Sequence, residues 1–198
     1  MSEEKRVRNM SVRLPLTSEA LAQQYRDNGF WQDLTIAEKF FVAAKCSPSK
    51  TAIIYNDEKT SYETLVEKVK SLASNLIRIG LQPGDIVAGQ LPNCPEIPLL
   101  HLACNAVGLL YMPLHDSWRD AELSHLLKLA DVKVVVSLNE YRGFNHRKMF
   151  LELAKGLPQL KAIFCLGEAD QQSSDNFIPP LSDSVEDGVR ESHAVSYT

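Results

Sequence analysis

Apolar residues recur at three- and four-residue spacing in several stretches of the chain, a spacing typical of amphipathic helices. The clearest stretch follows Thr60 and Glu63, which have the spacing of a capping box, and ends at Gly80. The same reasoning predicts helices over residues 18–28, from 35 onward, over 95–107, from 117–120 onward and over 145–155. Because residues 95–107 are apolar on nearly all sides, we expect that helix to be buried, with His101 as a satisfied core histidine.

Short apolar runs of strand length lie between these helices. They predict strands over residues 51–55, 85–91, 109–114, 132–137 and 161–166. Val134, Val135 and Val136 are consecutive, and such unbroken apolar strands belong to sheets covered on both faces. Strand and helix alternate from residue 85 onward, which predicts an α/β fold: a doubly wound, mostly parallel sheet with helices on both faces. The pattern does not define the strand order.

The chain divides into three parts by composition. We expect an arm with a short helix over residues 1–33, an α/β body over 34–168 and a polar tail over 169–198. Phe30 and Trp31 are adjacent aromatic residues in the arm, and we expect them to pin it to the body's surface.

Composition and charge exclude several classes of protein. The 198 residues are 44% hydrophobic and 23% charged, as in a globular domain, and the net charge of -4 without a Lys/Arg cluster argues against nucleic acid as a partner. No apolar run follows the polar first residues, and residues 97–110 are too short and too polar to span a bilayer. We therefore expect no membrane span and a cytoplasmic location.

The four cysteines are not spaced along the sequence as metal ligands are. We interpret Cys46, Cys94, Cys104 and Cys165 as small buried hydrophobic residues in a reducing compartment. No other His, Cys or carboxylate group has the spacing of a metal site, so we expect no bound metal.

Ligands of parallel sheets collect beyond the carboxyl ends of the strands, which makes the residues after each strand the candidates for a site. No predicted strand is followed by a glycine-rich turn, so we do not expect this segment alone to bind a nucleotide. His115 and Trp118 follow one strand and are candidate substrate-pocket residues. The alternatives are that His115 caps the next turn and that Trp118 staples the following helix. No catalytic residue is predicted.

A series of short motifs resembles the N-terminal region of the adenylate-forming superfamily, which includes acyl- and aryl-CoA ligases. The matching segments are residues 60–65 (TSYETL), 80–85 (GLQPGD), 90–93 (QLPN), 105–114 (NAVGLLYMPL), 120–123 (DAEL) and 132–136 (VKVVV). They occur in the family's order and cover roughly residues 35–168. In the arm, residues 25–34 (YRDNGFWQDL) are similar to the entry motif of the 2,3-dihydroxybenzoate–AMP ligase group.

The resemblance implies an ATP- and Mg²⁺-dependent ligase that activates an aromatic, cyclic or medium-chain carboxylic acid as an acyl-adenylate. It then implies transfer to the thiol of CoA or a carrier protein, in fatty acid or aromatic acid metabolism. The family's phosphate loop would follow a pair such as Tyr197-Thr198, so Thr198 is at best the edge of the ATP site.

On this interpretation the chain is an inactive N-terminal fragment of a ligase, with no cofactor of its own and a tendency to self-associate. The alternatives are a naturally truncated, non-enzymatic interaction or regulatory module, and an unrelated nucleotide-binding α/β domain.

Overall fold

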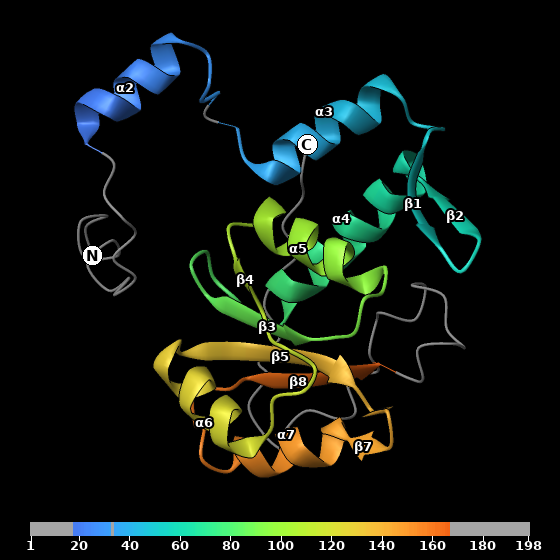
Figure 1. Ribbon diagram of the computed structural model, residues 1–198, viewed down its shortest axis with the longest axis vertical. Helices are drawn as coiled ribbons and strands as arrows, with labels where there is room; N and C mark the ends of the chain where they lie inside the picture. The colour runs from blue at the N-terminus through green and yellow to red at the C-terminus, as the bar shows by residue number, and fades with distance from the viewer. Residues whose placement is uncertain (1–17, 33, 167–198) are drawn as a thin grey trace. The chain divides into compact units, whose positions relative to one another are not determined.

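A computed structural model describes residues 18–32 and 34–166. The chain forms two compact units, residues 1–35 and 36–198, which are described separately (Figure 1). In the first unit, helix α2 (Glu19–Asp27) begins at Ser18, whose hydroxyl accepts a hydrogen bond from the Leu21 amide. The rings of Phe30 and Trp31 lie 6.3 and 5.3 Å from that of Tyr25 in the same unit. That these aromatics also pin the arm to the body stays a prediction.

The second unit begins with helix α3 (Ile36–Cys46) and an antiparallel hairpin of β1 (Thr51–Tyr55) and β2 (Glu58–Ser61). Asn56 and Asp57 between the strands both have positive φ, the conformation that tight hairpin turns require. The prediction that Thr60 caps the next helix was wrong, because Thr60 pairs within the hairpin. The helix is instead capped by Ser61, whose hydroxyl accepts from the Thr64 amide at 3.2 Å.

The central sheet confirms the predicted doubly wound α/β class. Its strands are β3 (Ile86–Gln90), β4 (Leu110–Pro113), β5 (Val132–Leu138) and β8 (Ala162–Leu166). They lie in the order β4-β3-β5-β8, and each neighbouring pair is parallel. Strand β3, the first of these four along the chain, is therefore an inner strand, and β4, the next, lies at an edge.

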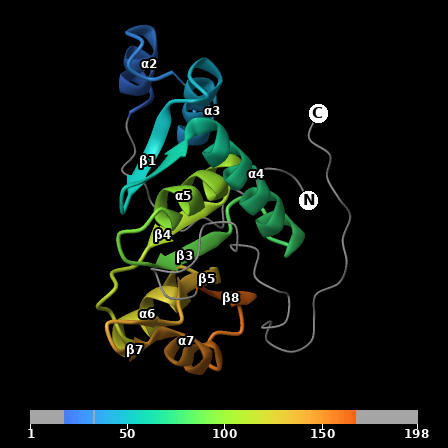
Figure 2. The same ribbon diagram turned by 90° about the vertical axis from the view of Figure 1, so that its right-hand side faces the viewer.

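Helices cover both faces of this sheet, as Figures 1 and 2 show. Helices α4 (Tyr62–Arg78) and α5 (Glu96–Ala106) share one core with Val87, Val134 and Val136. Helices α6 (Asp120–Leu129) and α7 (His146–Ala154) share the other core with Ala88 and Val135. Consecutive buried valines thus face opposite layers, which explains the unbroken apolar run in β5.

A short hairpin, β6 (Glu140–Tyr141) and β7 (Phe144–Asn145), precedes α7 and was not predicted. Its turn contains Arg142 and Gly143, both with positive φ. Asn145 then caps α7, since its side-chain oxygen accepts from the Lys148 amide at 2.7 Å. The hairpin therefore determines where α7 starts.

Helix α5 is only partly buried, contrary to the expectation of burial on all sides. His101 is exposed and lies 5.5 Å from the ring of Tyr111, so its assignment to the core was wrong. Asn105, on the same helix, accepts a hydrogen bond from the Ala37 amide at 2.9 Å. This contact links the first turn of α3 to a helix 68 residues further along the chain.

The cysteines divide by burial. Cys94 and Cys104 are buried as expected, and burial raises the pKa of each thiol to about 12, with Glu96 adding to the rise at Cys94. Cys46 is exposed, because it ends α3 beside the loop to the first hairpin, so its predicted burial was wrong.

Candidate functional site

The strand order places a topological switch at the carboxyl ends of β3 and β5. The connection after β3 leads to α5 on one face of the sheet, and the connection after its neighbour β5 leads to α7 on the other (Figure 2). In open parallel sheets, ligands bind where the connections of two adjacent strands leave in opposite directions in this way. Gln90, the last residue of β3, lies at that point and is only 2% exposed.

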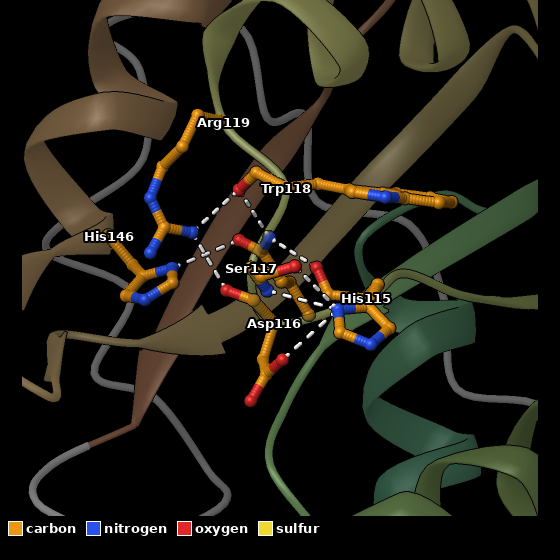
Figure 3. Close-up of polar contacts among 7 residues, drawn as sticks. His115, Asp116, Ser117, Trp118, Arg119 and His146 are labelled. Carbon is orange, nitrogen blue, oxygen red and sulfur yellow. Dashed lines mark hydrogen bonds and ion pairs between the residues drawn. The ribbon is translucent and has the colours of Figure 1, made fainter.

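Residues 115–119, here called the 115–119 segment, cross the carboxyl end of β3. The Gln90 side-chain amide donates to the carbonyl oxygens of His115 at 2.8 Å and Trp118 at 3.0 Å. Figure 3 shows the segment from His115 to Arg119 with His146 beside it. Just before the segment, the Leu114 amide donates to the Gly89 carbonyl oxygen at 2.8 Å. The chain's own backbone therefore occupies the end of the strand where a ligand crevice would open.

His146 anchors the same arrangement from α7. It is the first residue of that helix and is 2% exposed, and its Nδ1 lies 3.0 Å from the side-chain oxygen of Gln90. Burial lowers the pKa of His146, the Arg119 charge lowers it further, and the Asp116 carboxylate opposes the shift. Gln90 thus connects β3, the 115–119 segment and α7 through three hydrogen bonds.

Arg119 holds the far end of the segment. One guanidinium nitrogen donates to the carbonyl oxygens of Asp116 and Trp118, both at 2.8 Å. The guanidinium also lies 4.0 Å from the centre of the Phe144 ring, a cation–π distance. The Arg119 amide donates to the carboxylate of Glu122 in the first turn of α6, and this hydrogen bond lowers the pKa of the Glu122 carboxyl. Both the backbone and the side chain of Arg119 therefore have fixed partners.

The two candidate pocket residues lie within this segment. The side chain of His115 is 66% exposed, and its Nδ1 lies 3.2 Å from the Ser117 amide and 2.8 Å from the Ser117 hydroxyl. Trp118 packs against the core beneath α6 and α7, with its ring 6.3 Å from that of His115. These contacts match the turn-capping and stapling alternatives, and a role in a substrate pocket stays a prediction. Thr198 lies outside the described residues.

The sequence did not single out Gln90, Arg119 or His146. A signal existed for Gln90, because a long polar residue ends an otherwise apolar strand. A weaker signal existed for His146, which directly follows an asparagine able to cap a helix.

Within residues 18–32 and 34–166, no three His, Cys, Asp or Glu side chains are placed to hold a metal ion. At Gly89, the glycine nearest the switch point, a Cβ would lie 2.7 Å from the Tyr111 hydroxyl, so the Tyr111 ring fills the space beside this glycine. We derive no chemical step for ATP or Mg²⁺ from the described residues. No helix in the described part is long and apolar enough to cross a membrane.

These features define a doubly wound α/β layer whose switch point is closed by its own chain. A profile described as AMP-binding enzyme matches residues 40–193, more than half of the chain, and the protein belongs to this family.

Two curated relatives indicate the kinds of ligase to which the chain is similar. It is 31% identical over 156 residues to the medium-chain fatty-acid–CoA ligase of Escherichia coli strain K12, covering 78% of this chain and 27% of that protein. It is 29% identical to the vibriobactin-specific 2,3-dihydroxybenzoate-AMP ligase of Vibrio cholerae, covering 76% and 28%. The chain thus spans little more than a quarter of the length of these relatives.

Solved structures agree on the fold. The apo structure of Mycobacterium smegmatis MbtA superimposes with a TM-score of 0.68 at 24% identity, covering 91% of this chain and 33% of that one. The acetoacetyl-CoA synthetase of Streptomyces lividans superimposes with a TM-score of 0.58 at 28% identity, covering 72% and 23%.

Proposed function

We propose that this chain supplies the N-terminal scaffold of an adenylate-forming ligase that joins a carboxylic acid to AMP and then to a thiol. The observation that carries the proposal is membership of the AMP-binding enzyme family, together with 31% identity to a medium-chain fatty-acid–CoA ligase. The proposed acid is aromatic, cyclic or medium-chain, because relatives named for medium-chain fatty acids and for 2,3-dihydroxybenzoate are both similar to the chain. The proposed acceptor is the thiol of CoA or of a carrier protein, in the cytoplasm.

The chemistry proposed for the complete protein uses ATP and Mg²⁺ to convert a carboxylate, a poor electrophile, into an acyl-adenylate whose AMP leaves readily. The described residues would contribute positioning. Gln90 and Arg119 fix the 115–119 segment, and helices on both faces hold the sheet beneath it. A rigid layer of this kind holds the site residues of neighbouring parts of an enzyme in fixed positions.

We also propose that these 198 residues alone do not form acyl-adenylates. The support is the 115–119 segment, which lies across the strand end where an open parallel sheet would otherwise receive a ligand.

Carboxylate-dependent exchange of pyrophosphate into ATP tests both proposals. The 198-residue chain and its complete reading frame would each be assayed with octanoate, 2,3-dihydroxybenzoate and acetate. We expect exchange only for the complete protein, and only with octanoate or 2,3-dihydroxybenzoate. Exchange by the 198 residues would refute the inactivity of the chain alone. Preference for acetate would refute the proposed acid class, and a complete protein inactive with every acid would favour a regulatory or interaction role.

A further inference from the structure

Hydrogen-bond directions around Gln90 determine which ring nitrogen of neutral His146 carries the hydrogen. The amide nitrogen of Gln90 faces two carbonyl oxygens, those of His115 and Trp118, and carbonyl oxygens only accept hydrogen bonds. The side-chain oxygen of Gln90 is therefore the atom that faces His146 Nδ1 at 3.0 Å, and it too only accepts. Nδ1 must carry the hydrogen, so neutral His146 has a bare lone pair on Nε2.

The surroundings of Nε2 disfavour a second proton. Nε2 is buried, and none of the residues that the structure describes offers it a hydrogen-bond partner. A proton added there would create a buried cation whose N–H group has no acceptor among those residues, which is costly.

The groups around the ring come from three elements. From the 115–119 segment, the Arg119 charge opposes protonation and the Asp116 carboxylate favours it. From β7, the uncharged Phe144 ring meets the His146 ring edge-on at 5.0 Å. His146 also begins α7, and the positive end of a helix dipole disfavours a cation at that position. Burial and the Arg119 charge outweigh the Asp116 carboxylate, so the pKa of His146 is lowered.

We propose that His146 is a proton-sensitive latch on the 115–119 segment. Neutral His146 donates to Gln90 and keeps the Gln90 amide aimed at the segment's two carbonyl oxygens. Protonated His146 gains stability by moving Nε2 toward water, and this movement breaks its bond to Gln90 and loosens the segment over the end of β3. The proposal concerns the conformation of this chain and does not depend on the ligase activity.

The direction of the pH dependence follows from the lowered pKa. The loosened state, with an accessible ring, binds a proton near the ordinary value of 6.5, whereas the closed state binds one only at lower pH. The latch is therefore fully closed above about pH 6.5 and weakens as the pH falls through the lowered pKa of the closed state.

Fluorescence of Trp118 reports the state of the segment. In the 198-residue chain carrying Trp31→Phe, Trp118 is the remaining tryptophan. We expect its emission to change reversibly between pH 7.5 and 5, without loss of far-ultraviolet circular dichroism. His146→Asn places an amide donor near the position of Nδ1 but cannot titrate, and it should abolish the transition. His115→Asn removes the imidazole ring next to Trp118 and should leave the transition in place, whereas loss of the transition in this variant would assign the signal to His115.

Nitrogen-15 NMR of the unsubstituted chain gives a test that needs no variant. At pH 7.5 we expect the His146 ring to show hydrogen on Nδ1 and a free lone pair on Nε2, and to titrate below 6.5. Hydrogen on Nε2, titration at or above 6.5, or an unchanged Trp118 transition in His146→Asn would overturn the latch. None of these outcomes bears on acyl-adenylate formation, so failure of the latch is distinguishable from failure of the proposed function.

Discussion

The ring of Tyr111 on β4 fills the space that a side chain at Gly89 on β3 would need. A Cβ at position 89 would lie 2.7 Å from the Tyr111 hydroxyl oxygen and 2.8 Å from a ring carbon. Replacing glycine in a strand usually stabilises it, since glycine loses the most freedom on folding. Here the overlap reverses the sign, and we predict that Gly89→Ala destabilises the chain by about 1–3 kcal/mol in urea unfolding.

Two comparisons isolate the contact. Gly156→Ala is the matched control, because a Cβ there meets its nearest atom at 3.7 Å and should cost nothing. In a Tyr111→Ala background, Gly89→Ala should lose most of its effect. An equal cost in both backgrounds would contradict the assignment.

The Gln90 side chain makes three hydrogen bonds at the covered end of β3. Gln90→Leu keeps an apolar stem of similar size but leaves the His146 N–H without its partner. It also removes one of two donors from each carbonyl oxygen, since that of His115 keeps the Trp118 amide and that of Trp118 keeps Arg119. We predict a loss of about 3 kcal/mol in the free energy of unfolding. Gln82→Leu, at an exposed position, should change it by less than about 0.5 kcal/mol. Similar losses for the two variants would show that Gln90 is not an anchor.

The sequence predicts the central sheet well because burial on both faces leaves a readable pattern. The consecutive valines 134–136 and the glycines that follow α4, α5 and α7 (Gly80, Gly108 and Gly156) indicate the alternation directly. Strand β2 was missed because Glu58, Lys59 and Thr60 are polar and pair only with β1. The two-residue strands β6 and β7 are too short to show any periodicity.

The site was only partly predictable. His115 could be found because it follows a strand, where ligand-binding residues collect. The Gln90–His146 pair joins residues 56 positions apart, and their proximity depends on the strand order, which local spacing does not encode. The same limit applies to Asn105, whose partner at the start of α3 lies 68 residues away.

Asn105 serves as a remote cap for α3. Its side-chain oxygen accepts from the Ala37 amide, one of the first-turn groups that have no partner within their own helix. We predict that Asn105→Ala costs about 1 kcal/mol and speeds hydrogen exchange of the Ala37 amide. Asn105→Asp retains an acceptor and adds a favourable charge at a helix N-terminus, so it should protect that amide. Unchanged exchange in Asn105→Ala would contradict the cap.

Exposed apolar side chains predict self-association of the isolated chain. Ile54 is 66% exposed and Leu129 is 71% exposed, far more than most residues of their type. We expect the apparent mass in light scattering to rise with concentration, and Ile54→Thr combined with Leu129→Lys to reduce that rise. A concentration-independent monomer mass for the unsubstituted chain would contradict the prediction.

The order of strands has a consequence for synthesis on the ribosome. Strand β3 is made before both of its neighbours, and Ile86 at its start pairs with Leu110 on one side and with Val132 on the other. The edge of β3 that pairs with β5 has no partner until 46 more residues have been added, since Val132 follows Ile86 by that many positions. Nascent chains stalled within this interval expose a bare apolar strand edge, the feature by which chaperones and misfolding partners engage a growing polypeptide.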